Sequence, residues 1–367
     1  MVGSALSGQA SVLIDGREIC KKRGNGHFCR ELLYNISESA NLTDTRYICL
    51  IPDSTSKDIQ KGFTNVEFVT RKLFDPISWE QVALPLEALG HRVTHVLCPY
   101  NTFPIFLPPG VTKLIIYHDL IFLHPSRVRG GTKLFIGNIY RSFLFRFLSR
   151  FLRGRDIILT VSSYTRDLLL RFRGVDSVII GNSCKHTASI LANAAPAVCL
   201  GKYFLHIGGD ALTKNTKHII ASFLKARRIA GPSFPKLVIM GVTCNYAETL
   251  RKVFGFGGEV VFRFSISDEE KSSLIKGSLG VVFVSTKEGL GLPIIEAQAA
   301  GRPVITSRRR PMKDIVTEGD LLVSPTDESE LIAAYNTLAQ RNDKRSHLAV
   351  SNAVEIDQFQ IIENLLG

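Results

Sequence analysis

Short apolar runs alternate along the chain with longer stretches in which apolar residues recur every three or four positions. The short runs predict buried strands, and the longer stretches predict amphipathic helices. Strands are expected at 11–15, 47–52, 66–69, 94–98, 113–117, 157–161, 178–180, 203–207, 237–241, 260–264, 279–284, 303–305 and 321–323. Helices are expected to include 28–36, 78–89, 140–151, 219–224, 293–300, 328–338 and 358–366. This alternation favours parallel sheets covered by helices on both faces, the doubly wound α/β class.

The chain has 367 residues, of which 45% are apolar. That length and that apolar fraction are typical of two domains, each with its own core. The stretch from Cys184 to Leu200 is rich in alanine and turn-forming residues, which indicates a linker. The first domain is therefore expected at 1–190 and the second at 200–350.

The stretch 285–306 combines a strand end, a glycine-rich turn and the start of a helix. Pro293 follows the turn at a position where a helix needs no N–H partner, and the helix is expected to end near Gly301. The first N–H groups of a helix lack partners and its dipole is positive there, so this geometry suits a phosphate. Glycines let the backbone approach such a ligand closely. The turn consists of Glu288, Gly289, Leu290, Gly291 and Leu292.

Two carboxylates frame this turn. Glu296 is expected in the first helical turn, where the helix dipole alone favours a negative side chain. Glu288 precedes the helix, so the dipole does not explain its presence. Seven residues separate the two glutamates, and the surrounding string EGLGLPIIEAQAAGRPVI resembles the donor-site signature of retaining glycosyltransferases of family 4. The resemblance extends over roughly residues 12–365 and is most specific at 285–306.

The resemblance implies an architecture and a reaction. The architecture is GT-B, in which two Rossmann-like doubly wound domains face a cleft. The first domain takes the acceptor, the second takes a nucleotide sugar, and a closing helix within 351–367 packs back toward the first domain. The reaction transfers a hexose, with retention of configuration, to a lipid-linked or surface-glycan acceptor. The donor, GDP-mannose or a UDP-sugar, is a co-substrate, and no separate cofactor is expected.

The resemblance also implies roles for residues of the second domain. Glu288 contacts the transferred sugar and Glu296 holds the ribose hydroxyls. Lys214, in the segment YFLHIGGDALTKNTKHIIASF, binds the donor diphosphate. Gly208 and Gly209 end the strand before this lysine. Many relatives carry an arginine where Gly209 stands, so this chain lacks one part of the phosphate clamp.

Further residues match the family's pattern in three other segments. Ser265 and Ile266 lie where relatives hold the base with backbone groups. His118, in the segment YHDLIFLHP, matches a histidine that contacts the donor sugar, and it follows a predicted strand end, where ligands of open α/β sheets bind. Gly24 and Gly26 match an N-terminal glycine loop that closes over the donor and admits the acceptor.

No Asp-x-Asp metal motif stands near a strand end, so no metal is expected. Lys214 and the helix N-terminus would neutralise the leaving diphosphate instead. The leaving phosphate itself is expected to take the acceptor proton in a front-side reaction, which requires no strong side-chain base.

The chain is basic, with 45 Lys and Arg against 33 Asp and Glu, and its net charge of +12 points to an acidic partner. Nucleic acid is not expected among the partners. Residues 127–173 hold eleven of the basic residues and two acidic ones. Within 133–155, Arg146, Arg150 and Arg153 lie beside an apolar stripe of Tyr140, Phe143, Leu144, Phe147, Leu148 and Phe151. This pattern fits a core helix with a solvated basic face and an interfacial helix on an anionic membrane equally well.

Seven dispersed cysteines without a CxxC motif are typical of a reducing compartment. No apolar run reaches the ~20 residues that a membrane span needs, and the first ten residues do not resemble a signal peptide. A cytoplasmic protein, peripheral at the inner face of the cytoplasmic membrane if 133–155 binds lipid, is the expectation.

Two alternatives remain open at this point. A catalytically weak GT-B subunit that acts as a binding partner would fit the missing arginine at Gly209. A sugar-nucleotide epimerase or a phosphorylase could share the architecture, although neither carries the Glu288/Glu296 pair around GLGLP.

Overall fold

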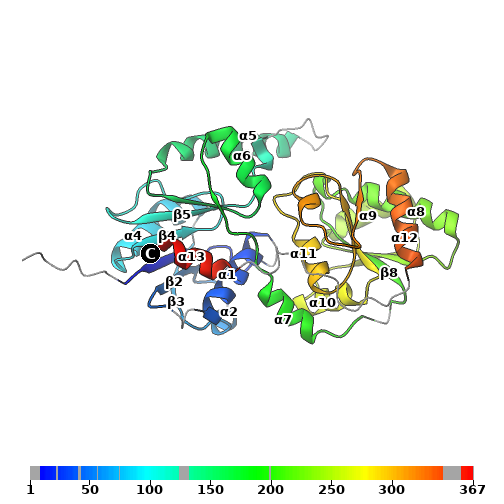
Figure 1. The fold of residues 1–367 in the computed structure, drawn as a ribbon, viewed down its shortest axis with the longest axis horizontal. Helices are drawn as coiled ribbons and strands as arrows, with labels where there is room; N and C mark the ends of the chain where they lie inside the picture. The colour runs from blue at the N-terminus through cyan, green and yellow to red at the C-terminus, as the bar shows by residue number, and fades with distance from the viewer. Residues whose placement is uncertain are drawn as a thin grey trace, which may run out of the picture. The chain divides into compact units, whose positions relative to one another are not determined.

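The computed structural model describes residues 9–21, 24–39, 43–55, 57–73, 75–123, 132–197, 200–341 and 357–366. The chain divides into two compact units, each a sheet covered by helices (Figure 1). The first unit comprises Met1–Ser126, Gly131–Ser183 and Ile356–Gly367, and the second comprises Arg127–Gly130 and Cys184–Glu355. Those parts of the predictions that concern 1–8, 124–131 and 342–356, including part of the closing segment, lie outside the described residues.

The first unit is built on a parallel sheet of seven strands in the order β3-β2-β1-β4-β5-β6-β7. Its central strands are buried on both faces, as Leu13 and Ile14 of β1 illustrate, which explains why they are continuous apolar runs. The strands are β1 (Ser11–Asp15), β2 (Arg46–Pro52), β3 (Val66–Arg71), β4 (His95–Cys98), β5 (Thr112–Tyr117), β6 (Ile157–Thr160) and β7 (Val178–Ile179).

Helices cover both faces of the first sheet. They are α1 (Asn25–Ser39), α2 (Lys57–Lys61), α3 (Pro76–Ser78), α4 (Leu84–Gly90), α5 (Thr132–Leu148), α6 (Ser163–Arg173) and α13 (Gln358–Leu366), with short turns η2 (Trp79–Ala83), η3 (Ile121–Leu123) and η4 (Ser149–Phe151). One face packs against α4, α5 and α6 through Leu84, Phe145 and Leu168. On the other face α13 lies beside α1, and its Phe359 contacts Tyr47 of β2 with ring centroids 6.2 Å apart.

The second unit has a parallel sheet of six strands in the order β10-β9-β8-β11-β12-β13. The strands are β8 (Tyr203–Ile207), β9 (Lys236–Met240), β10 (Val260–Arg263), β11 (Gly280–Phe283), β12 (Val304–Ser307) and β13 (Leu321–Val323). The helices are α7 (Lys185–Asn193), α8 (Thr216–Ala230), α9 (Cys244–Phe254), α10 (Asp268–Gly277), α11 (Leu292–Ala299) and α12 (Glu328–Gln340), with 3₁₀ turns η5 (Leu212–Lys214) and η6 (Met312–Asp314).

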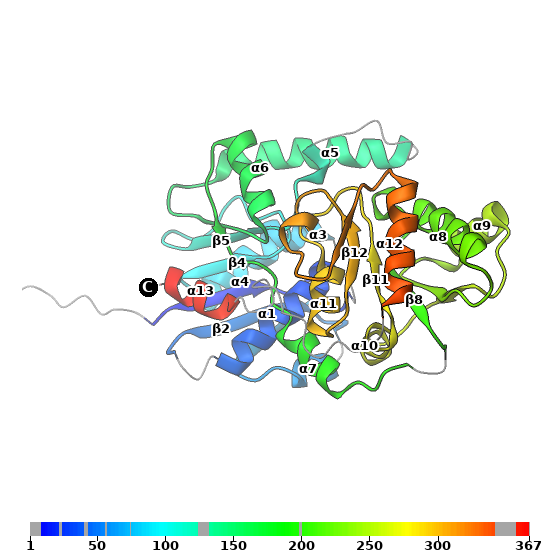
Figure 2. The same cartoon turned by 45° about the vertical axis from the view of Figure 1, so that its right-hand side comes forward.

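Two cores lie on opposite faces of the second sheet. Phe223 of α8 and Tyr335 of α12 pack in one, and Ile275 of α10 and Ile294 of α11 pack in the other. Figure 2 shows α8 and α12 on one side of this sheet and α10 and α11 on the other. The doubly wound α/β class expected from the sequence is therefore confirmed for both units.

Each sheet has one point at which the direction of strand addition reverses. It lies between β1 and β4 in the first unit and between β8 and β11 in the second. Ligands of open α/β sheets bind outside the carboxyl ends of the strands at such switch points. Functional side chains are therefore expected at these two places.

The prediction of a linker from Cys184 to Leu200 is wrong for its first half, because 185–193 form α7. Thr187 and Leu191 of this helix are buried, and α7 packs against α10 and α11. Lys276 of α10 donates to the Ala194 carbonyl at 2.9 Å, which fixes the end of α7. Tertiary packing rather than a strong apolar period thus stabilises this helix.

Candidate functional site

Lys214 and Glu288 meet at the switch point of the second sheet. Lys214 ends η5 in the loop after β8, and Glu288 lies in the loop after β11, so both follow the carboxyl ends of adjacent strands. Lys214 Nζ donates to Glu288 Oε1 at 2.8 Å and lies 5.0 Å from the centre of the Phe283 ring. Both side chains are partly buried, which strengthens their attraction relative to an exposed pair.

The loop that carries Lys214 is fixed by its neighbours. Asn215 adopts a left-handed backbone with φ of 59°, and its Nδ2 donates to the carbonyls of Val284 at 3.1 Å and Pro325 at 2.8 Å. The Thr286 N–H donates to the Thr213 carbonyl at 2.8 Å. These bonds join the loops after β8 and β11, so Lys214 and Glu288 are held in register.

Gly208 and Gly209 differ in how much space surrounds them. A Cβ at Gly208 would lie 2.4 Å from His206 Nε2, so a glycine is required there. A Cβ at Gly209 would lie 3.5 Å from Lys214 Cγ, an ordinary contact distance. The backbone therefore has room for a Cβ at Gly209. A clash at that atom does not explain why this chain lacks the arginine that the family resemblance predicts there.

The glycine-rich turn and α11 follow Glu288. Gly291 caps the helix with φ of 115°, a conformation that only glycine adopts easily. Pro293 has no N–H, and the Ile294 N–H already donates to the Gly291 carbonyl at 2.9 Å. Two of the first three helical positions thus offer no N–H to an anion. A phosphate at this site would therefore be attracted more by the charge of Lys214 and by the helix dipole than by the first backbone N–H groups of α11.

Glu296 is not in the first turn of α11, contrary to the sequence expectation. The helix begins at Leu292, so Glu296 is its fifth residue, where the dipole has little effect. The residue is 2% exposed, and Oε1 accepts a hydrogen bond from Lys271 Nζ of α10. A lysine partner, rather than the helix dipole, compensates this carboxylate.

Ser265 and Ile266 lie between β10 and α10, on the same carboxyl edge of the sheet. Ser265 is exposed and has a left-handed backbone with φ of 52°, which is uncommon for a residue with a side chain. Ile266 packs against the core that contains α10 and α11. The loop therefore presents backbone groups at its surface while one side chain anchors it.

Two cations near Glu288 were not predicted from the sequence. Arg309, in the loop after β12, donates from Nη1 to the Thr286 carbonyl at 3.4 Å. Burial lowers the pKa of Lys287, and the nearby Arg309 charge lowers that pKa further. Since no motif marks either residue, only the fold reveals that three loops bring positive charge to this edge.

His118 of the first unit follows β5 at the carboxyl edge of its sheet. Its backbone N–H donates to Asn101 Oδ1 at 2.7 Å, and its ring contacts Phe28 with centroids 4.6 Å apart. The ring Nε2 lies 2.7 Å from the Pro99 carbonyl, which can only accept, so Nε2 carries the hydrogen. Burial lowers the pKa of His118 to about 4, which keeps the ring neutral and Nδ1 an acceptor.

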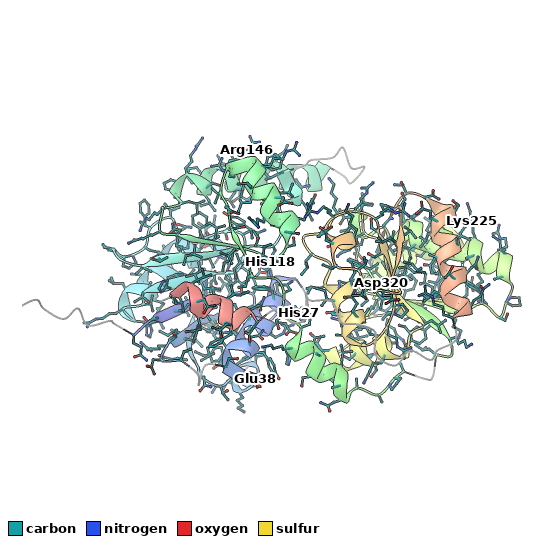
Figure 3. All side chains as sticks on the ribbon, in the orientation of Figure 1. His27, Glu38, His118, Arg146, Lys225 and Asp320 are labelled. Atoms are coloured by element: carbon teal, nitrogen blue, oxygen red, sulfur yellow. The ribbon has the colours of Figure 1, made fainter. Side chains whose placement is uncertain are left out.

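The predicted glycine loop lies at the same end of the first sheet, where Figure 3 labels His27 and His118. Gly24 has φ of 56°, and its carbonyl accepts from the Phe28 N–H at 3.1 Å, which starts α1. A Cβ at Gly26 would lie 2.2 Å from the Lys21 carbonyl oxygen, so a glycine is required there. Both glycines thus shape the turn from β1 into α1.

A buried polar cluster at the end of β1 lies at the switch point of the first sheet. Trp79 Nε1 donates to Asp15 Oδ1 at 2.8 Å. Arg17 Nη2 pairs with Glu80 Oε2 at 2.8 Å and donates to Thr102 Oγ1 at 2.9 Å. We call these five residues the β1 cluster. Trp79 and Glu80 belong to η2, whose first three residues, Trp79 to Gln81, we call the WEQ string.

Helix α5 carries part of the basic segment predicted at 133–155, and the side chains of 132–136 lie outside the described residues. Phe145 and Leu148 are buried in the core, whereas Phe143 is 66% exposed and stacks on the partly exposed Phe147 at 6.3 Å. Arg146 is exposed on the outer side of α5 (Figure 3). The apolar stripe is thus divided between core and surface, which neither sequence interpretation anticipated.

Within the described ranges, no group of three or more His, Cys, Asp or Glu side chains is arranged to hold a metal ion. In the same part of the chain, no helix combines the length and the apolar character that crossing a membrane requires.

Comparisons with solved structures identify the fold. Solved structures with the same fold include the lipopolysaccharide outer core galactosyltransferase WaaB, with 15% identity, a TM-score of 0.62, and 97% of this chain and 99% of that chain covered. Anabaena HepE, solved with UDP-glucose, has 14% identity and a TM-score of 0.64, with 97% and 98% covered. The chain therefore has the GT-B fold of glycosyltransferases.

Sequence comparisons indicate the activity. Residues 201–353 match the profile of glycosyl transferases group 1, and together with the relatives named here this match identifies the chain as a glycosyltransferase. The O-antigen chain mannosyltransferase RfbU of Salmonella typhimurium is 28% identical over 279 residues, which cover 74% of this chain and 72% of RfbU. The O-antigen chain mannosyltransferase B of Escherichia coli is 23% identical over 279 residues, with 72% and 66% covered.

Proposed function

We propose that this glycosyltransferase moves a hexose from a nucleotide sugar to a lipid-linked or surface-glycan acceptor, with retention of configuration and without a metal. The observation that carries the proposal is the 2.8 Å contact between Lys214 Nζ and Glu288 Oε1 at the switch point of the second sheet. It joins a phosphate-binding cation to a carboxylate that can accept from sugar hydroxyls.

The residues have distinct roles in this proposal. When the donor binds, Lys214 turns from Glu288 to the diphosphate, and Glu288 is released to accept hydroxyl hydrogens of the sugar. Lys214, Lys287 and Arg309 together offset the charge that grows on the leaving diphosphate. Because this charge is met by protein cations, no metal ion is required. The loop at Ser265 and Ile266 holds the base, and Glu296 holds the ribose.

The bond changes are those of direct transfer. The donor bond between the anomeric carbon and the phosphate oxygen breaks, and the acceptor hydroxyl oxygen forms a bond to the same face of that carbon. The acceptor proton passes to the leaving phosphate oxygen. His118, neutral because burial lowers its pKa to about 4, offers Nδ1 as an acceptor to a sugar hydroxyl and is not the base.

The relatives support a particular substrate class. Two are named O-antigen chain mannosyltransferases, and WaaB is named a lipopolysaccharide outer core galactosyltransferase. The donor proposed here is accordingly GDP-mannose or a UDP-hexose, and the acceptor is a growing surface glycan, free or carried on a lipid. HepE, named with UDP-glucose, supports the UDP alternative.

A lipid-linked acceptor would be met at the inner face of the cytoplasmic membrane. The outer face of α5 suits peripheral contact there, because Tyr140, Phe143 and Phe147 are exposed beside Arg141 and Arg146. Such a mixture of rings and arginines binds the headgroup region of anionic membranes.

The test is a donor screen. Wild-type protein and Glu288→Gln are incubated with GDP-mannose, UDP-glucose, UDP-galactose and UDP-N-acetylglucosamine, and release of the nucleoside diphosphate is measured with and without short glycan acceptors. One donor should be consumed by the wild type and not by the variant. Equal release by both proteins would contradict the proposed site.

A further inference from the structure

Lys271 is the ion-pair partner of Glu296, and the two residues lie on either side of β11 in the sequence. Lys271 comes from α10, which precedes this strand, and Glu296 comes from α11, which follows it. Their side chains are 19% and 3% exposed, and Nζ donates to Oε1. A carboxylate buried to this extent is strongly disfavoured as an anion unless a cation accompanies it, and Lys271 supplies that cation.

The segment around Lys271 connects two parts of the expected nucleotide site. Ser267 caps α10 by accepting from the Glu270 N–H at 3.1 Å, and the base-binding loop at Ser265 and Ile266 comes directly before this cap. Lys271 is one helical turn further along the same rigid element. A rigid helix that carries both is suited to hold site residues in fixed positions.

We propose that Lys271 is a positioning residue for the nucleoside: its ion pair holds the Glu296 carboxylate in place and fixes its direction, so that ribose hydroxyls meet a ready acceptor. This inference rests on the proposed function, in which Glu296 binds the ribose. A carboxylate offers about four lone-pair directions, so the contact with Lys271 does not by itself exhaust its capacity to accept. Lys271 acts through Glu296 and does not itself touch the nucleoside.

If the Lys271–Glu296 pair had only a structural role, its loss would have different effects. It would join α10 to α11, and its loss would lower stability and weaken every nucleotide to the same degree. A lysine that positions a ribose acceptor instead affects only those nucleotides that have ribose hydroxyls. Nucleotides with and without these hydroxyls therefore separate the two roles.

The experiment is calorimetric titration of the whole chain with GDP and UDP and with their 2′,3′-dideoxy counterparts. Wild type should bind one ribonucleotide about 10- to 100-fold more tightly than its dideoxy form, because hydrogen bonds to a charged acceptor are lost. In Lys271→Met that preference should fall to within about threefold, while the affinity for the dideoxy form stays within about twofold of wild type. Lys271→Gln, which keeps a donor but not the charge, should fall between them.

Lys276→Met is the matched control, because it removes a lysine of the same helix that contacts the Ala192 and Ala194 carbonyls. It should keep the wild-type preference for the ribonucleotide. In a Glu296→Gln background, Lys271→Met should have no further effect on that preference. The melting temperature of each variant shows that it is folded, and Lys271→Gln decides the question if Lys271→Met does not fold.

The outcomes distinguish this inference from the proposed function. If wild type binds neither diphosphate, or binds ribo and dideoxy forms equally, the proposed nucleotide site is wrong and the inference fails with it. If wild type prefers the ribonucleotide and Lys271→Met preserves that preference, or weakens both forms equally, only the role of Lys271 is overturned.

Discussion

The indole Nε1 of Trp79 donates a 2.8 Å hydrogen bond to Oδ1 of Asp15, and both side chains are about 1% exposed. This contact lies at the centre of the β1 cluster, at the carboxyl end of the first sheet. It unites the first predicted strand with the WEQ string, 64 positions further along the chain. Because Arg17 shares its charge between Asp15 and Glu80, neither carboxylate has a cation to itself.

The first prediction concerns stability against pH. Burial raises the pKa of Asp15 from 3.8 to about 6, so between these values the folded state holds more protons than the unfolded chain. Stability from this group therefore falls as pH rises from about 4 to 6 and stays low above 6. Asp15→Asn removes that dependence, and the stability of the variant relative to wild type should improve by about 2 kcal/mol from pH 4 to pH 7.

Melting temperatures of wild type, Asp15→Asn and the exposed control Asp53→Asn at four pH values provide the measurement. The control shows how the melting temperature responds to replacing an exposed aspartate by asparagine, and the change for Asp15→Asn is read against it. A gap between wild type and Asp15→Asn that stays constant with pH would show that Asp15 ionises in the folded protein as it does in the unfolded chain.

The second prediction concerns Glu288. Glu288→Gln keeps the size of the side chain but removes the charge that pairs with Lys214, so the rate of transfer should fall about 10²–10³-fold. Glu248→Gln, an exposed glutamate of α9, is the matched control and should retain full rate. Steady-state assays with saturating donor give the comparison. Wild-type turnover in Glu288→Gln would remove this residue from the donor site.

The third prediction concerns Lys214. Lys214→Ala should weaken binding of the nucleoside diphosphate about tenfold or more, because a charge-assisted contact to phosphate is lost. The effect is expected to be large because no arginine stands at position 209. Lys217→Ala, an exposed lysine at the start of α8, should bind as wild type does. Titration calorimetry with GDP and UDP measures both; unchanged affinity in Lys214→Ala would exclude it from the phosphate site.

The strands were predictable because each central one is buried on both faces and is therefore a continuous apolar run. The Lys214–Glu288 contact was partly predictable, since each residue belongs to a string that resembles a family motif, although their pairing was not foreseen. Lys271 could not be found in this way. Its partner Glu296 is 25 residues further along the chain, with β11 between them, and nothing in its local sequence distinguishes it from a solvated lysine.

The sequence also could not predict which aromatic side chains of α5 face the core. Apolar residues occur nearly all round this helix, so spacing alone does not say which of them face the core. The structure resolves this by burying Phe145 and Leu148 and leaving Phe143 and Phe147 at the surface. Helix α7 was likewise not predicted. Its packing against α10 and α11 stabilises it, although its apolar pattern is weak.

The fourth prediction concerns metals. If Lys214, Lys287 and Arg309 meet the charge of the leaving diphosphate, transfer should proceed at an unchanged rate in EDTA. The measurement is the initial rate in EDTA, compared with the rate in added Mg²⁺ or Mn²⁺. Loss of activity in the chelator, with recovery when one of these ions is restored, would show that a metal carries the charge instead.

The last prediction concerns membranes. Exposed Phe143 and Phe147 lie beside Arg146 and Arg150 on the outer face of α5 and η4, so the chain should bind anionic vesicles more strongly than neutral ones. Each arginine near an anionic surface contributes about 1 kcal/mol, and reversing two charges should abolish most of the binding. Because such attraction is screened, high salt should weaken it, while ring insertion should leave a salt-resistant part.

The charge attraction and the ring insertion are measured by co-sedimentation with phosphatidylglycerol-rich and with neutral phosphatidylcholine vesicles, at low and high salt. Arg146→Glu/Arg150→Glu tests the charges, and Phe143→Ser/Phe147→Ser tests the rings. A matched control is Arg251→Glu/Lys252→Glu on α9 of the second unit, which also reverses two exposed basic residues and should bind as wild type does. Equal partitioning of wild type and Arg146→Glu/Arg150→Glu in every condition would mean that the basic face of α5 is only a solvated surface.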